Sequence, residues 1–93
     1  MKIIVFTSKN CHSCHPHFLN IKKVVEERFP QVQVEEHPVE KYPEEATKFW
    51  IRSTPTAIAF EREKPVNTMI GAYPPREIEK WIIESLGLTG ERK

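Results

Sequence analysis

The sequence has no long hydrophobic run. The apolar stretch near its start, IIVF at residues 3–6, is four residues long, which is too short for the hydrophobic region of a signal peptide or for a membrane-spanning helix. An excess of one charge is also missing, because the net charge is +1 and acidic and basic residues interleave. No clustered basic face for nucleic acid is therefore expected. These absences predict a cytoplasmic protein that binds neither membranes nor nucleic acids.

Repeats, low-complexity tracts and linker-like segments are missing as well. A chain of 93 residues is long enough for one hydrophobic core. Its content of 39% hydrophobic and 29% charged residues is that of an ordinary globular protein. We therefore predict a single domain over residues 1–93 and expect a monomer.

Cysteine is scarce, but its placement is informative. The two cysteines, Cys11 and Cys14, lie in the stretch NCHSCHPH together with His12, His15 and His17. Ordinary cysteines stay reduced in the cytosol, so a pair three residues apart there is more often catalytic or metal-binding than structural. This stretch leaves both possibilities open.

The first half of the chain predicts a strand, a helix and a second strand. Residues 2–8 are continuously apolar and rich in β-branched side chains, as in a strand buried on both faces. After the cysteines, apolar residues recur at helical spacing up to Pro30. Residues 32–36 alternate between apolar and polar, which predicts a half-buried strand. The predicted helix face consists of Phe18, Ile21, Val24, Val25 and Phe29.

The second half predicts a helix, a hairpin and a last helix. Pro43 followed by two glutamates is typical of a helix start, and Ala46, Phe49 and Trp50 are expected to form its buried face. Residues 56–60 and 66–70 read as paired strands joined by a charged turn. The last helix follows Pro74 and Pro75 and ends at a Gly87 cap. Its inward residues are expected to be Ile78, Trp81, Ile82 and Leu86.

The order β-α-β-α-β-β-α predicts an α/β fold. A right-handed crossover makes the first two strands parallel, and the hairpin adds antiparallel strands. The result is a four-stranded mixed sheet flanked by three helices, with the cysteines where a central strand turns into a helix.

Three landmarks make this sequence resemble the thioredoxin family over nearly the whole chain. They are Cys11-His12-Ser13-Cys14 after a buried strand, the segment IRSTPT at residues 51–56, which resembles the family's cis-proline loop, and Gly71 at the end of the last strand. The family's extra N-terminal strand and helix are missing, so the resemblance implies the minimal, glutaredoxin-sized form of the fold.

The sequence departs from the family pattern around the cysteines. Asn10 stands where a tryptophan normally precedes the first cysteine, and Val5 stands where thioredoxins carry a buried aspartate. The dipeptide between the cysteines is His-Ser, which is neither the Gly-Pro of thioredoxins nor the Pro-Tyr typical of glutaredoxins.

The resemblance implies a thiol–disulfide oxidoreductase acting on protein disulfides, with a redox-active Cys11–Cys14 disulfide and no other cofactor. Cys11, at the exposed helix start, is expected to attack, and the more buried Cys14 to resolve the mixed disulfide. The helix dipole and a protonated His12 favour the Cys11 thiolate. A reductase or a low-molecular-weight thiol would supply electrons.

The resemblance also implies a substrate-binding region. Pro55, if cis as in the family, would lie against the cysteine pair and present the Thr54 backbone to an extended substrate segment. Gly71 completes this region at the end of the last strand.

Two alternatives remain. A glutathione-dependent glutaredoxin fits the size, but the family's Gly-Gly…Asp pattern is missing after Met69, where the sequence reads GAYPPRE. A metal-binding module would use Cys11, Cys14 and the three nearby histidines. Zinc needs four converging ligands, whereas a helix beginning near Ser13 sends His15 and His17 to different sides, and both are expected to be exposed.

Glu36 is a candidate for the function of the missing aspartate. It shares a strand face with Val32 and Val34, which predicts that it turns inward. In a parallel sheet its end of the strand lies beside the cysteines. We hypothesise that Glu36 accepts the proton of Cys14, against the simpler reading that it ends the strand in solvent.

Overall fold

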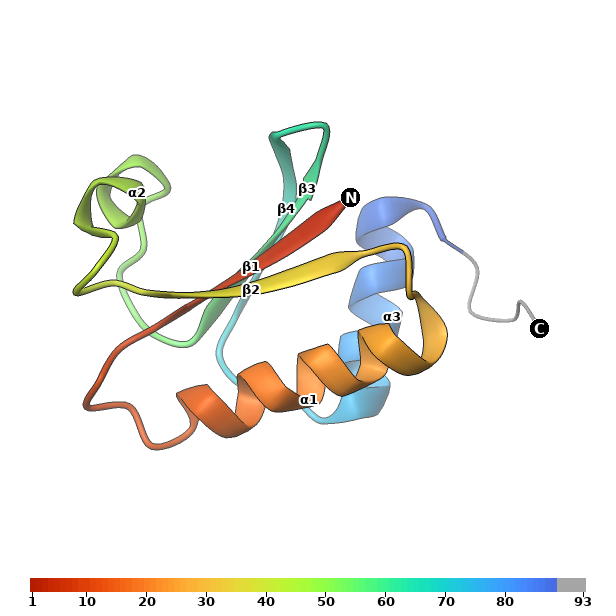
Figure 1. Cartoon of the computed structure of the whole chain (residues 1–93), viewed down its shortest axis with the longest axis horizontal. Coiled ribbons are helices and arrows are strands. Elements are labelled where there is room, and N and C mark those ends of the chain that lie inside the picture. Colours follow the sequence, from red (N-terminus) through yellow and green to blue (C-terminus); the bar gives the residue numbers. More distant parts are fainter. Residues whose placement is uncertain (89–93) are drawn as a thin grey trace.

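The computed structural model describes residues 1–88 and shows three helices around one sheet (Figure 1). The elements, in chain order, are β1 (Lys2–Thr7), α1 (Cys14–Arg28), β2 (Gln33–Pro38), α2 (Pro43–Lys48), β3 (Thr56–Glu61), β4 (Lys64–Ile70) and α3 (Pro75–Leu86). The part of the predicted domain formed by residues 89–93 lies outside the described residues.

The four strands form one mixed sheet in the order β2-β1-β3-β4. β1 pairs in parallel with β2 and antiparallel with β3, and β3 pairs antiparallel with β4. The predicted element order, the parallel crossover and the hairpin are thus confirmed, and the architecture is the minimal thioredoxin fold.

The sheet separates two apolar layers. Helices α1 and α3 cover one face, where Ile3 and Val5 of β1 pack with Ile21 of α1 and Ile78 of α3. Helix α2 lies on the other face, where Ile4 and Phe6 pack with Phe49 and Ile51 next to it (Figure 1). Because β1 is covered on both sides, its continuous apolar run is explained.

The hairpin turn is tighter than the sequence pattern predicted. Arg62 and Glu63 both have positive φ angles, 54° and 70°, as the two central residues of a type I′ turn do. This turn matches the twist of the flanking strands, so pairing continues to Glu61 and Lys64. β4 consequently begins at residue 64 and not at residue 66.

The prediction that Trp50 belongs to the buried face of α2 is wrong. The helix ends at Lys48, and Trp50 follows it in a left-handed conformation with φ 57°. The N–H of Trp50 donates to the Thr47 carbonyl (3.2 Å) and that of Ile51 to the Ala46 carbonyl (2.8 Å). This is the Schellman pattern of helix ends, and it turns Trp50 outward, leaving it 75% exposed.

No helix within residues 1–88 is both long and apolar enough to cross a membrane.

Candidate active site

The cysteine pair lies in the loop between β1 and α1. Cys11 and Cys14 form a disulfide with an S–S length of 2.10 Å and a Cα–Cα distance of 5.4 Å. Helix α1 begins at Cys14, so Cys11 lies in the turn before it, where its carbonyl accepts the Cys14 N–H (3.3 Å). Cys14 is 2% exposed and Cys11 is half-buried. The expected difference in burial between the two cysteines is therefore present.

The proline loop is fastened to this cysteine loop. The peptide bond between Thr54 and Pro55 is cis. The Thr54 and Ser8 hydroxyls form a hydrogen bond of 3.0 Å, and the Ser8 carbonyl accepts the Cys11 N–H (3.3 Å). A short chain of contacts thus joins Cys11 through Ser8 to the residue before Pro55.

Gly71 is hydrogen-bonded to the proline loop. Its N–H donates to the Pro55 carbonyl at 2.8 Å. Gly71 has a φ angle of 99°, a conformation that side chains with a Cβ atom strongly disfavour. The structure therefore brings Thr54, Pro55 and Gly71 together from two segments of the chain.

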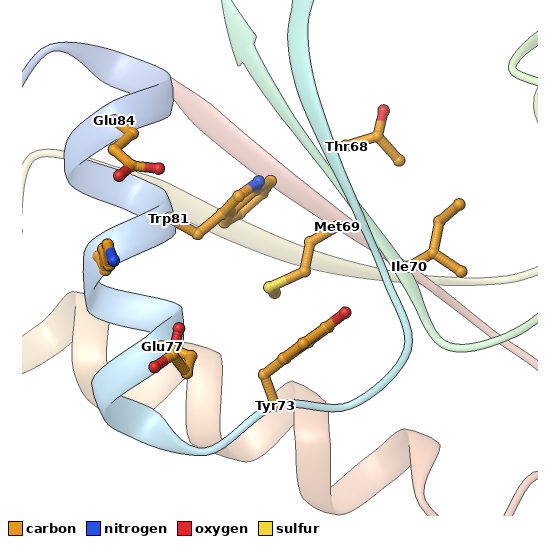
Figure 2. Close-up of a pocket in the computed structure, with 8 residues that line it drawn as sticks. Thr68, Met69, Ile70, Tyr73, Glu77, Trp81 and Glu84 are labelled. Atoms are coloured by element: carbon orange, nitrogen blue, oxygen red, sulfur yellow. The ribbon is translucent and has the colours of Figure 1, made fainter.

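A hollow of about 450 Å³ lies between β4 and α3, beyond Gly71. Figure 2 shows Met69, Tyr73 and Trp81 gathered in it, with Glu77 and Glu84 on the α3 side. Trp81 is 9% exposed, which confirms its predicted place in the core. The indole N–H of Trp81 is buried and has no hydrogen-bond partner within residues 1–88.

The histidines of the NCHSCHPH stretch separate into different environments. His12 is exposed in the cysteine loop. His15 is exposed on α1, as predicted, and its Nδ1 atom lies 3.8 Å from Glu36 Oε1. No group of three or more His, Cys, Asp or Glu side chains in the described part of the chain is arranged to hold a metal ion.

The prediction that His17 is exposed is wrong. His17 is 2% exposed, because it follows Cys14 by three residues and precedes Ile21 by four, on the buried face of α1. Its Nδ1 atom accepts the Tyr73 N–H at 3.5 Å, while Nε2 is buried and has no partner among the described residues. Burial lowers the pKa of His17, since the charged ring would be poorly solvated there.

The burial of Glu36 is intermediate between the inward-facing and the solvent-exposed positions considered for it. It pairs in register with Val5, and its side chain is 28% exposed. The Thr7 hydroxyl donates to its Oε2 at 3.1 Å. Together with the His15 contact, this holds the carboxylate beside the first turn of α1, on the sheet face that α1 covers.

A second glutamate supports the cysteine loop. The Lys9 N–H donates to Glu40 Oε2 at 3.1 Å, and this hydrogen bond lowers the pKa of Glu40. The loop before Cys11 is thereby tied to the segment after β2.

Sequence reasoning missed Ser8, Thr7 and His17 as parts of this region. The position of Thr7 and Ser8 at the end of a central strand, directly before the cysteine loop, is the signal that could have identified these two residues. For His17, the signal is its helical spacing from Cys14 and Ile21. These are contacts of neighbouring segments, and each side chain by itself looks ordinary in the sequence.

A disulfide between cysteines three residues apart, at the junction of a central strand and a helix and next to a cis-proline loop, defines a thiol–disulfide oxidoreductase site. The sequence matches the Thioredoxin family model over residues 1–84. The chain belongs to the thioredoxin family.

Solved structures with the same fold share little sequence with this chain. Thioredoxin 1 from the thermophilic eubacterium Thermosipho africanus TCF52B is similar with a TM-score of 0.78 and 20% identity, covering 94% of this chain and 96% of that chain. A structure described as that of a malarial protein is similar with a TM-score of 0.79 and 18% identity, over 91% of this chain and 96% of that one. The comparison with curated proteins finds no match.

Proposed function

We propose that the protein reduces or exchanges disulfides of other proteins through Cys11 and Cys14. The observation that carries this proposal is the unequal burial of the pair, with Cys11 half-buried and Cys14 only 2% exposed. A large substrate can bring its disulfide to Cys11 but not to Cys14. Cys11 is therefore the attacking residue, and Cys14 resolves the intermediate.

The reaction proceeds by two exchanges. In the reduced protein the Cys11 thiolate attacks one sulfur of the substrate disulfide. The substrate S–S bond breaks, a mixed disulfide with Cys11 forms, and the other substrate sulfur leaves as a thiolate. Cys14 then loses its proton and attacks the Cys11 sulfur, which releases the substrate with both sulfurs reduced. Two electrons pass to the substrate, and the protein is left with the Cys11–Cys14 disulfide.

The return to the dithiol form takes two electrons from a reductase or a low-molecular-weight thiol. The cycle uses no cofactor beyond the cysteine pair. We propose the cytoplasm as the place of this cycle, because thiol pools there keep ordinary cysteines reduced.

Neighbouring residues have separate roles in this proposal. His12, when protonated, adds positive charge beside the Cys11 thiolate. The backbone of Thr54 binds the substrate, and Pro55 and Gly71 form the surface on either side of it. Glu36, held by Thr7 beside the first turn of α1, accepts the Cys14 proton during resolution.

The trapping of a mixed disulfide tests the assignment of Cys11 and Cys14. Cys14→Ser should accumulate a covalent adduct with a protein that carries one accessible disulfide, because Cys11 can attack but nothing resolves. The adduct should be visible by non-reducing electrophoresis and mass spectrometry, with Cys11→Ser as the matched control. Adducts formed by Cys11→Ser and absent in Cys14→Ser would contradict the proposed roles.

A further inference from the structure

Trp50 occupies a position where folding alone does not call for tryptophan. It is the left-handed residue of the Schellman motif that ends α2, a position that glycine usually takes because a Cβ atom strains this conformation. Its side chain is nevertheless 75% exposed, so the indole contributes little to the core. A bulky apolar residue that is both strained and solvent-exposed indicates a role in binding.

The surroundings of Trp50 form a shallow shelf with an apolar floor. A groove of about 290 Å³ is lined by Ala46, Thr47, Trp50, Ile51 and Arg52. The Arg52 guanidinium lies 5.7 Å from the centre of the Trp50 ring, within range of a cation–π interaction. We use "Trp50 shelf" for these five residues.

The charged side chain of the Trp50 shelf, Arg52, is positive. Lys48 contacts the Phe49 ring, with its ammonium 5.4 Å from the ring centre. Within residues 1–88, neither Lys48 nor Arg52 has a carboxylate within ion-pair distance. An apolar floor with a cationic rim is complementary to a segment that carries apolar and acidic side chains.

The Trp50 shelf lies close along the chain to the proposed substrate-binding region. Trp50 precedes Thr54 by four residues, so their Cα atoms are at most about 14 Å apart. The segment between α2 and β3 runs along the same end of the molecule as the loop that carries Cys11 (Figure 1). An extended polypeptide at Thr54 therefore needs only about four or five further residues to reach Trp50.

We propose that the Trp50 shelf binds an apolar and acidic segment of protein substrates, four or five residues from the cysteine that Cys11 attacks. This inference rests on the proposed function and specifies its substrate class. Trp50 supplies the contact surface, and Arg52 selects acidic side chains. The shelf is a specificity element that leaves the sulfur chemistry itself unchanged.

Trp50→Gly is the most informative variant, since glycine suits the left-handed backbone and the fold is retained. The probes are a peptide with one internal disulfide flanked by Phe and Glu at the stated distance, the same peptide with Lys for Glu, and bis(2-hydroxyethyl) disulfide. With the reduced protein, Trp50→Gly should lower the second-order rate constant for the Phe/Glu peptide about tenfold. The rate with the small disulfide and the urea midpoint of unfolding should not fall.

Arg52→Glu tests the charge preference. It should reverse the order of the two peptides, so that the Lys peptide reacts faster than the Glu peptide. Val66→Ala is the matched control, because Val66 is another exposed apolar residue, near the hairpin turn, and its removal should change none of the rates. Equal rates for the wild type and Trp50→Gly with every peptide would overturn the inference, as would an equal slowing with the small disulfide.

A binding measurement separates this inference from the proposed function. Cys11→Ser/Cys14→Ser cannot exchange disulfides, but it should still bind a cysteine-free Phe/Glu peptide, and more weakly when Trp50→Gly is added. If the wild type exchanges no disulfide while this binding persists, the proposed oxidoreductase function is contradicted and the proposed peptide binding by the Trp50 shelf is supported. If the wild type exchanges disulfides but peptide binding does not depend on Trp50, the proposal for the Trp50 shelf is wrong and the proposed function is retained. Concentration-dependent dimerisation lost in Trp50→Gly, with peptide binding absent, would assign the shelf to a second copy and overturn the proposal.

Discussion

The hydroxyls of Thr54 and Ser8 lie 3.0 Å apart and join the cis-proline loop to the loop that carries Cys11. The two residues are 46 positions apart in the sequence, and both are half-buried. Because Ser8 also accepts the Cys11 N–H through its carbonyl, the distance between Cys11 and the proline loop depends on this contact.

Thr54→Val should therefore weaken the fold at the active site. The substitution keeps the side-chain shape and removes one hydrogen bond, which corresponds to a loss of about 1 kcal/mol in the free energy of unfolding. Urea denaturation of Thr54→Val, Ser8→Ala and the double variant measures the coupling between them. Thr47→Val is the control, since the Thr47 hydroxyl donates to the Pro43 carbonyl within helix α2 itself. Strictly additive effects of the two single substitutions would show that the hydroxyls do not stabilise each other.

His12→Gln should make the Cys11–Cys14 disulfide harder to reduce. Glutamine cannot carry the positive charge that a protonated His12 would place beside Cys11, so the thiolate is less stabilised and the reduction potential becomes more negative. For an exposed interaction of about 0.5–1 kcal/mol, the shift is about 10–20 mV. Redox equilibration against glutathione measures it, and 1 M salt should reduce the difference because exposed charges are screened. The same potential for wild type and variant at low salt would leave His12 as an ordinary loop residue.

Glu36→Gln should slow the resolution of the mixed disulfide and leave the rate of the first attack by Cys11 unchanged. Glutamine keeps an oxygen that can accept the Thr7 hydroxyl, but it is a poor proton acceptor, so we expect a loss of about tenfold or more in the resolution rate. Rapid mixing with a pre-formed mixed disulfide on Cys11 separates the two steps.

Glu35→Gln is the matched control for Glu36→Gln. Glu35 is the preceding residue of β2, and its carboxylate bonds to His37 Nε2 at 2.9 Å, on the opposite face of the sheet. Its replacement should leave the resolution rate unchanged. Equal resolution rates for the wild type and Glu36→Gln between pH 6 and 8 would rule out Glu36 as the proton acceptor.

His17 should make the stability of the fold depend on pH in the acid range. Its pKa in the folded state is lowered by burial, so the unfolded chain binds this proton more readily. Stability is therefore fully present above the ordinary histidine value of 6.5 and is lost as the pH falls from there towards the lowered pKa. For one proton the slope cannot exceed about 1.4 kcal/mol per pH unit.

His17→Leu should remove that part of the pH dependence. It should also cost about 1 kcal/mol at pH 8, because the Tyr73 N–H loses its acceptor. Urea denaturation between pH 5 and 8 measures both effects, with the exposed His12→Gln as the control that keeps the slope. An unchanged slope in His17→Leu would assign the pH dependence to other groups.

The sequence alone determined the order of the elements and the position of the cysteine pair. Continuous apolar residues in β1, helical spacing in α1 and α3, and the proline and glycine at the ends of α3 are local patterns, so each predicts its element without knowledge of the rest. The resemblance around Cys11, Pro55 and Gly71 added the family, because these landmarks are matched in both type and spacing.

Tertiary structure alone decided what surrounds each side chain. Trp50 continues the helical spacing of Ala46 and Phe49, but the helix ends at Lys48 and the Schellman turn rotates the indole into solvent. His17 is polar, yet the segment after β4 covers it and supplies the Tyr73 N–H. The contacts of Ser8 with Thr54 and of Gly71 with Pro55 join distant segments. Such contacts arise only when the sheet brings strand ends together, and no local periodicity in the chain encodes them.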